Sequence, residues 1–91
     1  KVVSPLTKIS STYDLVSLLE KNGMIFTTPV IIDGAIQASI SGILVWFSPE
    51  RDLAQQVRAL QLVLPKVKMD GKKVLKIDLR FNKVVIKYAE G

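Results

Sequence analysis

Cysteine and histidine are both missing from this chain of 91 residues. Without cysteine, neither a disulfide nor a thiolate metal site can form. Without histidine, the usual general base, zinc ligand and pH switch are missing as well. A catalytic site would need a Ser-Lys or Asp-based arrangement, and no such motif stands at a recognisable spacing. We therefore expect that the chain is not an enzyme and that it has no catalytic residue.

Glycine, acidic residues and long apolar runs are also sparse. The five glycines stand singly, so no glycine-rich phosphate loop is present, and the eight acidic residues are too dispersed for a calcium site. The longest unbroken apolar run, Ile43–Phe47, is too short to cross a membrane. These features predict no cofactor and no metal ion. Because the chain begins with Lys and has no signal-peptide layout, we interpret it as a domain excised from a longer protein.

Positive charge is concentrated in the C-terminal part of the chain. Residues 1–65 carry five basic and five acidic side chains, whereas residues 66–91 carry eight basic and three acidic ones, which accounts for the net charge of +5. Such a segment is typical of proteins that bind nucleic acid, anionic lipid or an acidic protein segment. Lysines on a solvated edge hairpin also simply discourage aggregation, and composition alone leaves both interpretations open.

The clearest structural pattern is the stretch Lys73–Tyr88. Apolar and polar residues alternate from Leu75 to Phe81, and the strand formers Val84–Tyr88 follow the turn residues Asn82-Lys83. This pattern predicts a β-hairpin with a two-residue loop. The expected core pairs are Phe81 with Val84, Leu79 with Ile86 and Ile77 with Tyr88; on the other face, Arg80 is expected opposite Val85, and Asp78 opposite Lys87 as a charge pair.

Two more tight turns are predicted upstream, at Asp33-Gly34 and Ser41-Gly42. A two-residue loop at the second turn predicts the strand pairs Ile40–Ile43, Ala38–Val45 and Ile36–Phe47. Leu44 and Trp46 then lie on the face opposite this core, where an apolar pair needs a cover from a helix, the chain end or a partner.

Two helices are predicted. The first begins at Ser11 or Thr12, after a connector at residues 1–9, and ends at Asn22-Gly23. The second begins with Ser48 as its cap and ends at Pro65, and the basic link Lys66–Lys72 follows it. The chain is therefore expected to be a single α+β domain. It has a mainly antiparallel sheet of about five strands, two helices packed on one face and the C-terminal β-hairpin at the sheet edge.

An exposed last strand favours a role in protein interaction. At a sheet edge, the unpaired N–H and C=O groups of Val84–Tyr88 can accept a strand from another chain, and the nearby basic residues favour an acidic partner. A basic nucleic-acid-binding module is the alternative. It is less favoured because Phe81 is expected in the core, which leaves only Tyr88 for stacking on bases.

The second half of the chain resembles a known family. The predicted helix DLAQQVRALQLVLP (Asp52–Pro65), followed by DGKKVLKIDLRF (Asp70–Phe81), is similar to the extracytoplasmic β domain of the bacterial cell-division protein family FtsQ/DivIB. In that family a helix ending in Leu/Tyr-Pro leads to an Asp-Gly link and a [IV]DLR[YF] strand. Gly42–Ser48 resembles the strand before this helix, and Leu15–Gly23 resembles an earlier helix more loosely.

The resemblance implies a non-enzymatic scaffold of the divisome that supports septum formation. It implies a single-pass membrane protein with a polypeptide-transport-associated (POTRA) domain ahead of this β domain. The domain would lie on the extracytoplasmic (periplasmic) face of the cytoplasmic membrane, at the division site. The implied partners are small coiled-coil division proteins of the FtsB/FtsL (DivIC) type, which add a β-strand at the C-terminal edge; no nucleic acid or small-molecule substrate is implied. Another envelope assembly domain that holds a different partner remains a further alternative.

The resemblance also suggests residues that contact the partner. Arg80 and Phe81 match the Arg-aromatic pair of DLR[YF], and Tyr88-Ala89 resembles an aromatic-Ala pair at the end of the last strand. Phe81 lacks the hydroxyl of the Tyr variant, and Lys83 stands where some members have small residues or glycine. The candidate partner-binding residues are Arg80, Phe81, Lys83, Val85, Lys87, Tyr88 and Ala89.

Overall fold

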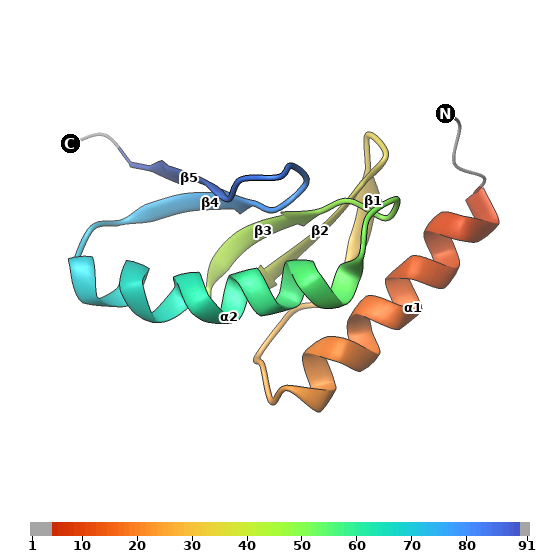
Figure 1. Cartoon of the computed structure of the whole chain (residues 1–91), viewed down its shortest axis with the longest axis horizontal. Helices are drawn as coiled ribbons and strands as arrows, with labels where there is room; N and C mark the ends of the chain where they lie inside the picture. The colour runs from red at the N-terminus through yellow and green to blue at the C-terminus, as the bar shows by residue number, and fades with distance from the viewer. Residues whose placement is uncertain (1–4, 90–91) are drawn as a thin grey trace.

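The computed structural model describes residues 5–89, with residues 5–8 described by their backbone alone. The elements in chain order are α1 (Pro5–Lys21), β1 (Val30–Ile32), β2 (Ala35–Ile40), β3 (Ile43–Phe47), α2 (Leu53–Asp70), β4 (Val74–Asp78) and β5 (Val85–Tyr88). The strands form one sheet in sequence order, antiparallel throughout except where β4 pairs parallel to β3 after the α2 crossover (Figure 1). The predicted α+β fold is confirmed, with β5 at the sheet edge.

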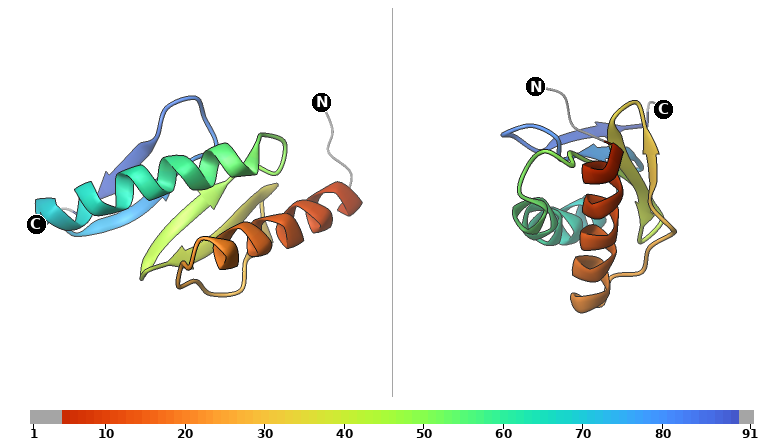
Figure 2. Two further views of the ribbon diagram at one scale, coloured as in Figure 1. Left: turned by 60° about the horizontal axis from the view of Figure 1, so that its bottom comes forward. Right: turned by 90° about the vertical axis from the view of Figure 1, so that its right-hand side faces the viewer.

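Both helices cover the same face of the sheet (Figures 1 and 2). We call this face the inner face and the opposite one the outer face. Fully buried side chains from the two helices and from the three central strands meet between the layers; the largest are Phe47, Leu15, Leu19, Ile36, Ile40, Leu60 and Ile77. Burying a large aliphatic or aromatic side chain stabilises the fold by about 1.5 to 3 kcal/mol, so this cluster holds the helices on the sheet.

The two predicted turns upstream are confirmed. Asp33 and Gly34 have φ of 51° and 78°, and Ser41 and Gly42 have φ of 52° and 83°. Positive φ at both central residues is the geometry of a two-residue type I′ hairpin, whose twist matches that of the strands. The predicted pairs across the second turn, from Ile40↔Ile43 to Ile36↔Phe47, are also present.

The first helix begins earlier than predicted. It starts at Pro5 rather than at Ser11 or Thr12, so residues 5–9 of the predicted connector are helical, while residues 1–4 lie outside the described residues. Proline needs no hydrogen-bond partner for its nitrogen and has a helical φ, which suits the first turn. The predicted end is confirmed, because the helix stops at Lys21 and Gly23 has the left-handed φ of 67°.

Both predicted ends of the second helix are wrong. The cap is Asp52, whose carboxylate accepts from the Gln55 N–H at 3.2 Å, and Pro65 lies inside the helix, which continues to Asp70 and ends at Gly71 with φ 67°. The buried stripe extends past the proline to Val67. The burial of Val67 on this extra turn compensates for the hydrogen bond that proline cannot donate. Residues 66–70 of the predicted basic link are therefore the last part of α2.

The C-terminal hairpin is present, but its predicted register and loop are wrong. β4 ends at Asp78 and β5 begins at Val85, so the loop spans residues 79–84 instead of two residues. Ile77 pairs with Ile86, and Asp78 lies opposite Val85 rather than Lys87. The shift of two residues keeps Ile77 and Ile86 on the inner face and leaves Asp78 and Val85 on the outer face. An irregularity between Val74 and Lys76 leaves Leu75 exposed.

Candidate functional site

The free side of β5 is the first component of the candidate site. β5 pairs with β4 only, and within residues 5–89 no strand lies along its other side. The Ala89 N–H donates inward to the Lys73 carbonyl at 2.9 Å. Because successive residues of a strand direct their backbone groups to alternate sides, the N–H and C=O groups of Ile86 and Tyr88 point outward. These groups are available to a further strand.

The loop at residues 79–84 is held by an ion pair at Arg80 and by a hydrogen bond that the Leu79 N–H donates to the Trp46 carbonyl at 2.9 Å. The Arg80 guanidinium donates from Nε to Asp78 Oδ1 at 2.9 Å and from Nη2 to Asp78 Oδ2 at 2.7 Å, and the Arg80 backbone N–H donates to Asp78 Oδ1 at 3.0 Å. Asp78 is only 4% exposed. These bonds turn the chain away from the strand direction after Asp78. The predicted Asp78–Lys87 charge pair is therefore wrong, and Arg80 is its actual partner.

This environment shifts the pKa of both groups. Burial alone raises the pKa of Asp78, but the hydrogen bonds from Arg80 and the charges of Arg80 and Lys76 together lower it below its ordinary value of 3.8. The hydrogen bond to Asp78 raises the pKa of Arg80, which outweighs the opposite effect of its burial. Both groups are therefore ionised in the folded protein at neutral pH, and the positive charge of Arg80 is largely neutralised by Asp78.

Trp46 lies on the outer face beneath two cations. The Lys76 Nζ and the Arg80 Cζ are each 4.5 Å from the centroid of its ring, a separation at which cation–π attraction is significant. The indole Nε1 is shielded from solvent and has no hydrogen-bond partner among the described residues. The cover that the sequence requires for Trp46 is thus supplied by β4 and its loop. Leu44 stays exposed.

Phe81 is exposed at the surface, contrary to the prediction that it lies in the core. Its side chain is 57% exposed, and the Arg80 Cζ is 5.2 Å from its ring centroid. Phe81 lies beside an open hollow of about 530 Å³ whose lining includes three cationic side chains, Arg51, Arg80 and Lys83, together with Val85. An aromatic ring next to cations suits a partner segment that carries both apolar and acidic residues.

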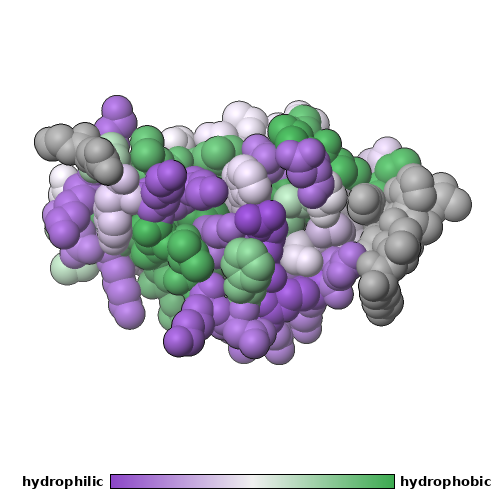
Figure 3. All heavy atoms as spheres, turned by 90° about the horizontal axis from the view of Figure 1, so that it is seen from above, coloured by the Kyte–Doolittle hydropathy of each residue, from purple (hydrophilic) through white to green (hydrophobic). Residues whose placement is uncertain are grey.

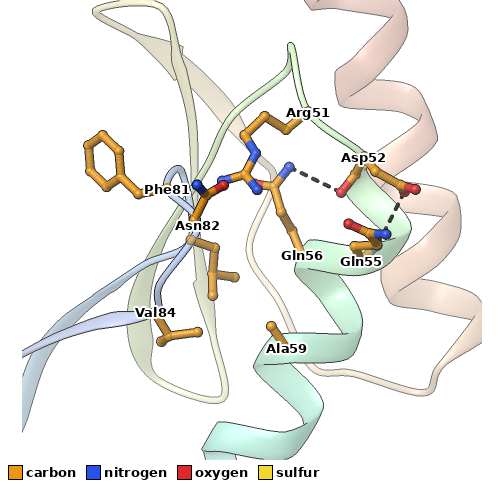
Figure 4. A pocket seen from close by; sticks show the side chains of 9 residues that line it. Arg51, Asp52, Gln55, Gln56, Ala59, Phe81, Asn82 and Val84 are labelled. Carbon is orange, nitrogen blue, oxygen red and sulfur yellow. Dashed lines mark hydrogen bonds between the residues drawn. The ribbon is translucent and has the colours of Figure 1, made fainter.

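A smaller cavity of about 200 Å³ separates the loop from the start of α2 (Figure 4). Arg51 reaches across it and donates from Nη1 to the Arg80 carbonyl at 3.2 Å. Gln56 is buried at its base, where it donates to the Ser48 carbonyl at 3.0 Å and accepts from the Ser48 N–H at 2.8 Å. Phe81 points away from this cavity in Figure 4. These bonds fix the position of the loop relative to α2.

The remaining candidate residues follow the same edge of the molecule. Lys83 is exposed in the loop, and Val85 and Lys87 are exposed on the outer face. Lys87 lies directly opposite Lys76 in the β4–β5 pair, an arrangement of like charges that is unfavourable without an anion nearby. Tyr88 is half-buried with the Lys72 Nζ 5.6 Å from its ring centroid, and Ala89 is tied to β4 by its backbone.

The structure brings the predicted residues together and adds others. The seven candidates lie along β5 and its preceding loop, and Arg51, Trp46, Lys76 and Asp78 complete their surroundings. Sequence reasoning missed Arg51 because it precedes α2 and meets the loop only through tertiary packing. Trp46 was identified by its strand face, but nothing in the sequence indicated which side chains would cover it.

Side chains that could hold a metal ion are not gathered in the described part of the chain. No cluster of three or more metal-binding side chains is found there. Nor does any helix within residues 5–89 have the length and apolar character needed to cross a membrane. What the edge offers is backbone hydrogen bonding, an exposed aromatic ring and positive charge.

Comparison with known proteins adds no identification. No protein-family model matches the chain, and no curated protein sequence matches it.

Proposed function

We propose that this chain is a non-enzymatic scaffold domain that binds a partner by accepting a β-strand along β5. The observation that carries the proposal is the unpaired side of β5, where the backbone groups of Ile86 and Tyr88 point away from the sheet. Strand addition uses such groups for affinity and uses neighbouring side chains for specificity. No reactive side chain is required for this role.

The charge around β5 supports an acidic partner segment. Lys83 and Lys87 are exposed beside the free edge, and Arg51 lines the hollow next to Phe81. An acidic residue of the added strand beside Lys87 would relieve its repulsion with Lys76 on the neighbouring strand. Arg80 contributes less to this attraction, because Asp78 already neutralises it.

We further propose that the scaffold is the β domain of a divisome protein of the FtsQ/DivIB type. The motif Ile77–Phe81 and the preceding helix and Asp-Gly link support this assignment. In that setting the partners are FtsB/FtsL-like (DivIC) coiled-coil proteins, and the domain acts on the extracytoplasmic face of the cytoplasmic membrane during septum formation. Catalysis, cofactors and metal ions have no part in the proposal.

A binding titration with a matched pair of variants tests strand addition. The ligand is the extracytoplasmic part of the FtsB-like protein from the same organism, titrated calorimetrically into the chain. Tyr88→Pro removes an outward N–H, and we expect it to weaken binding about tenfold or more. Tyr88→Ala removes the ring but keeps the N–H, and is expected to retain most of the affinity. Equal affinity for the wild type and Tyr88→Pro would contradict strand addition at β5.

A nucleic-acid-binding module is the second candidate, and the exposed ring of Phe81 favours it. Phe81 lies beside the hollow lined by Arg51 and Lys83, and an exposed aromatic ring among cations can stack on a base. Trp46 is not free for stacking, since Lys76 and Arg80 lie against its ring. Single-stranded DNA and RNA binding that falls steeply with salt, and that Phe81→Ala weakens, would support this candidate. No retention of the chain on either polymer at low salt would remove it.

If the FtsB-like protein does not bind, the partner assignment fails while strand addition can still hold. An envelope assembly domain of another kind would then bind a different strand at the same edge. Capture of partners by the wild-type chain from envelope extracts, compared with capture by Tyr88→Pro, distinguishes the two outcomes. A partner lost with Tyr88→Pro but retained with Tyr88→Ala supports edge binding without the divisome assignment.

A further inference from the structure

The opposite edge of the sheet carries an exposed apolar surface that the proposed function does not use. The three residues of β1, Val30, Ile31 and Ile32, are 49%, 39% and 42% exposed. β1 pairs with β2 only, and within the described part of the chain no strand lies along its other side. Figure 3 shows hydrophobic residues gathered at this edge, in the upper right of the view.

An apolar groove of about 420 Å³ runs between β1 and α1, and α1 supplies its second wall. Ile9, Tyr13 and Val16 line the groove from the helix, at a spacing of four and three that places them on one side of α1. Tyr13 is 72% exposed. This row is separate from the core row of Leu15 and Leu19. Soluble monomers rarely expose contiguous apolar surfaces of this kind, so a partner surface is indicated.

The distribution of charge identifies that partner. Among the side chains that the structure describes, none that lines the groove is charged, whereas the whole surplus of positive charge lies in residues 66–91, which include the end of α2, β4 and β5. Two copies that meet at β1 would therefore keep their positive regions apart. Two copies that meet at β5 would instead bring their exposed lysines together. We propose that β1 and the groove form a symmetric interface with a second copy of this chain.

The backbone of β1 suits a two-fold axis at Ile31. In a two-residue hairpin the closing residues, here Ile32 and Ala35, bond to each other, so Ile32 and Val30 direct their backbone groups toward β2. Ile31 then directs its N–H and C=O outward. Two antiparallel copies of Ile31 can exchange two hydrogen bonds across the axis, with both side chains on the inner face beside the groove. Pro29 has no N–H, which keeps the pairing short and favours a closed dimer.

Sedimentation of the whole chain over a range of concentrations tests this interface. We expect a reversible monomer–dimer equilibrium that changes little with salt, because the described side chains that line the groove are uncharged. Ile31→Lys places two new charges opposite each other at the axis, and we expect it to raise the dissociation constant at least about tenfold. Val85→Lys is the matched control at the other edge and should leave the equilibrium unchanged.

A second variant keeps the test decisive if Ile31→Lys fails to fold. Tyr13→Glu changes a highly exposed side chain on α1, so its circular dichroism should match that of the wild type, while its dimer should be weakened as well. A chain that stays monomeric at millimolar concentration would overturn the proposal, as would a dimer that neither variant weakens. Open-ended oligomers would also overturn it, since they require pairing between unlike edges. Partner binding at β5 is measured separately and does not depend on this result.

Discussion

The two edges of the sheet differ in charge, in length of free strand and in how they are held. β1 is a three-residue apolar strand that follows Pro29 and is closed by a type I′ turn. β5 is a four-residue strand that follows Lys83 and contains Lys87, and the loop before it is held in part by the Asp78–Arg80 ion pair. The β1 edge is therefore specified by local turn chemistry, whereas the β5 edge depends on side-chain interactions with other parts of the fold. Two strands that each lie open at a sheet edge therefore need not bind the same kind of partner.

Breaking the Asp78–Arg80 ion pair should lower the stability of the domain by releasing the loop before β5. Asp78→Ala leaves the partly buried Arg80 without its partner and releases the loop, so we expect the free energy of unfolding to fall by about 2 to 3 kcal/mol. Urea unfolding measures this change. Glu50→Ala removes an exposed acid as a control and should change stability by less than about 0.5 kcal/mol. Equal effects of the two substitutions would mean that the loop is not held by Asp78.

The same ion pair should make the stability depend on pH in acid. The pKa of Asp78 is lower in the folded protein than its ordinary value of 3.8. A carboxylate of this kind contributes stability that is fully present above its unfolded pKa and is lost as the pH falls through its folded pKa. We therefore expect unfolding measurements from neutral pH downward to show a loss that begins near pH 4 and continues below it. Asp78→Asn should flatten this part of the profile; an unchanged profile would contradict the role of Asp78.

Core and edge positions should respond differently to loss of an aromatic side chain. Phe47→Ala opens a cavity in the core and should cost about 3 to 5 kcal/mol of stability, because Phe47 is fully buried. Phe81→Ala should cost about 1 kcal/mol or less, since its ring is mostly in solvent. Thermal or urea unfolding of both variants makes the comparison. Comparable losses for the two would place Phe81 back in the core, where the sequence pattern puts it.

The smallest expected effect concerns the lysines beside β5. Lys87→Glu should reduce the binding free energy of an acidic partner by about 0.2 to 1 kcal/mol at low salt. The reduction should be smaller at high salt, because exposed charges are screened. Lys21→Glu at the end of α1 is the matched charge change and should leave affinity unaffected. Titrations at two salt concentrations provide the measurement. A loss for Lys87→Glu that does not vary with salt would show that charge is not what this residue contributes.

Local patterns predict much of this fold. The turn residues Asp33-Gly34 and Ser41-Gly42 require little beyond their own backbone preferences, so both turns and the register across the second one follow from the sequence. The alternation of apolar residues also assigns Ile77 correctly to the core. The parts that depend on local chemistry are thus the parts that sequence reasoning predicts well.

The errors arise where tertiary packing outweighs a local signal. Pro65 is a common helix stop, but burial of Val67 extends α2 past it. Asn82-Lys83 is a reasonable tight turn, but the bonds between Arg80 and Asp78 end β4 sooner and widen the loop. Neither competing interaction is visible in spacing alone. The same reason explains why sequence reasoning missed Arg51, because its contact with the loop joins positions far apart in the chain.

Amide hydrogen exchange at β5, with and without the FtsB-like partner, tests the central claim most directly. In the free chain we expect the outward N–H groups of Ile86 and Tyr88 to exchange fast, and the inward N–H groups of Val85 and Lys87 to exchange slowly. An added strand should slow exchange at Ile86 and Tyr88 in the complex and leave the β1 edge unchanged. A saturating partner that leaves the amides of Ile86 and Tyr88 unprotected would contradict strand addition at β5.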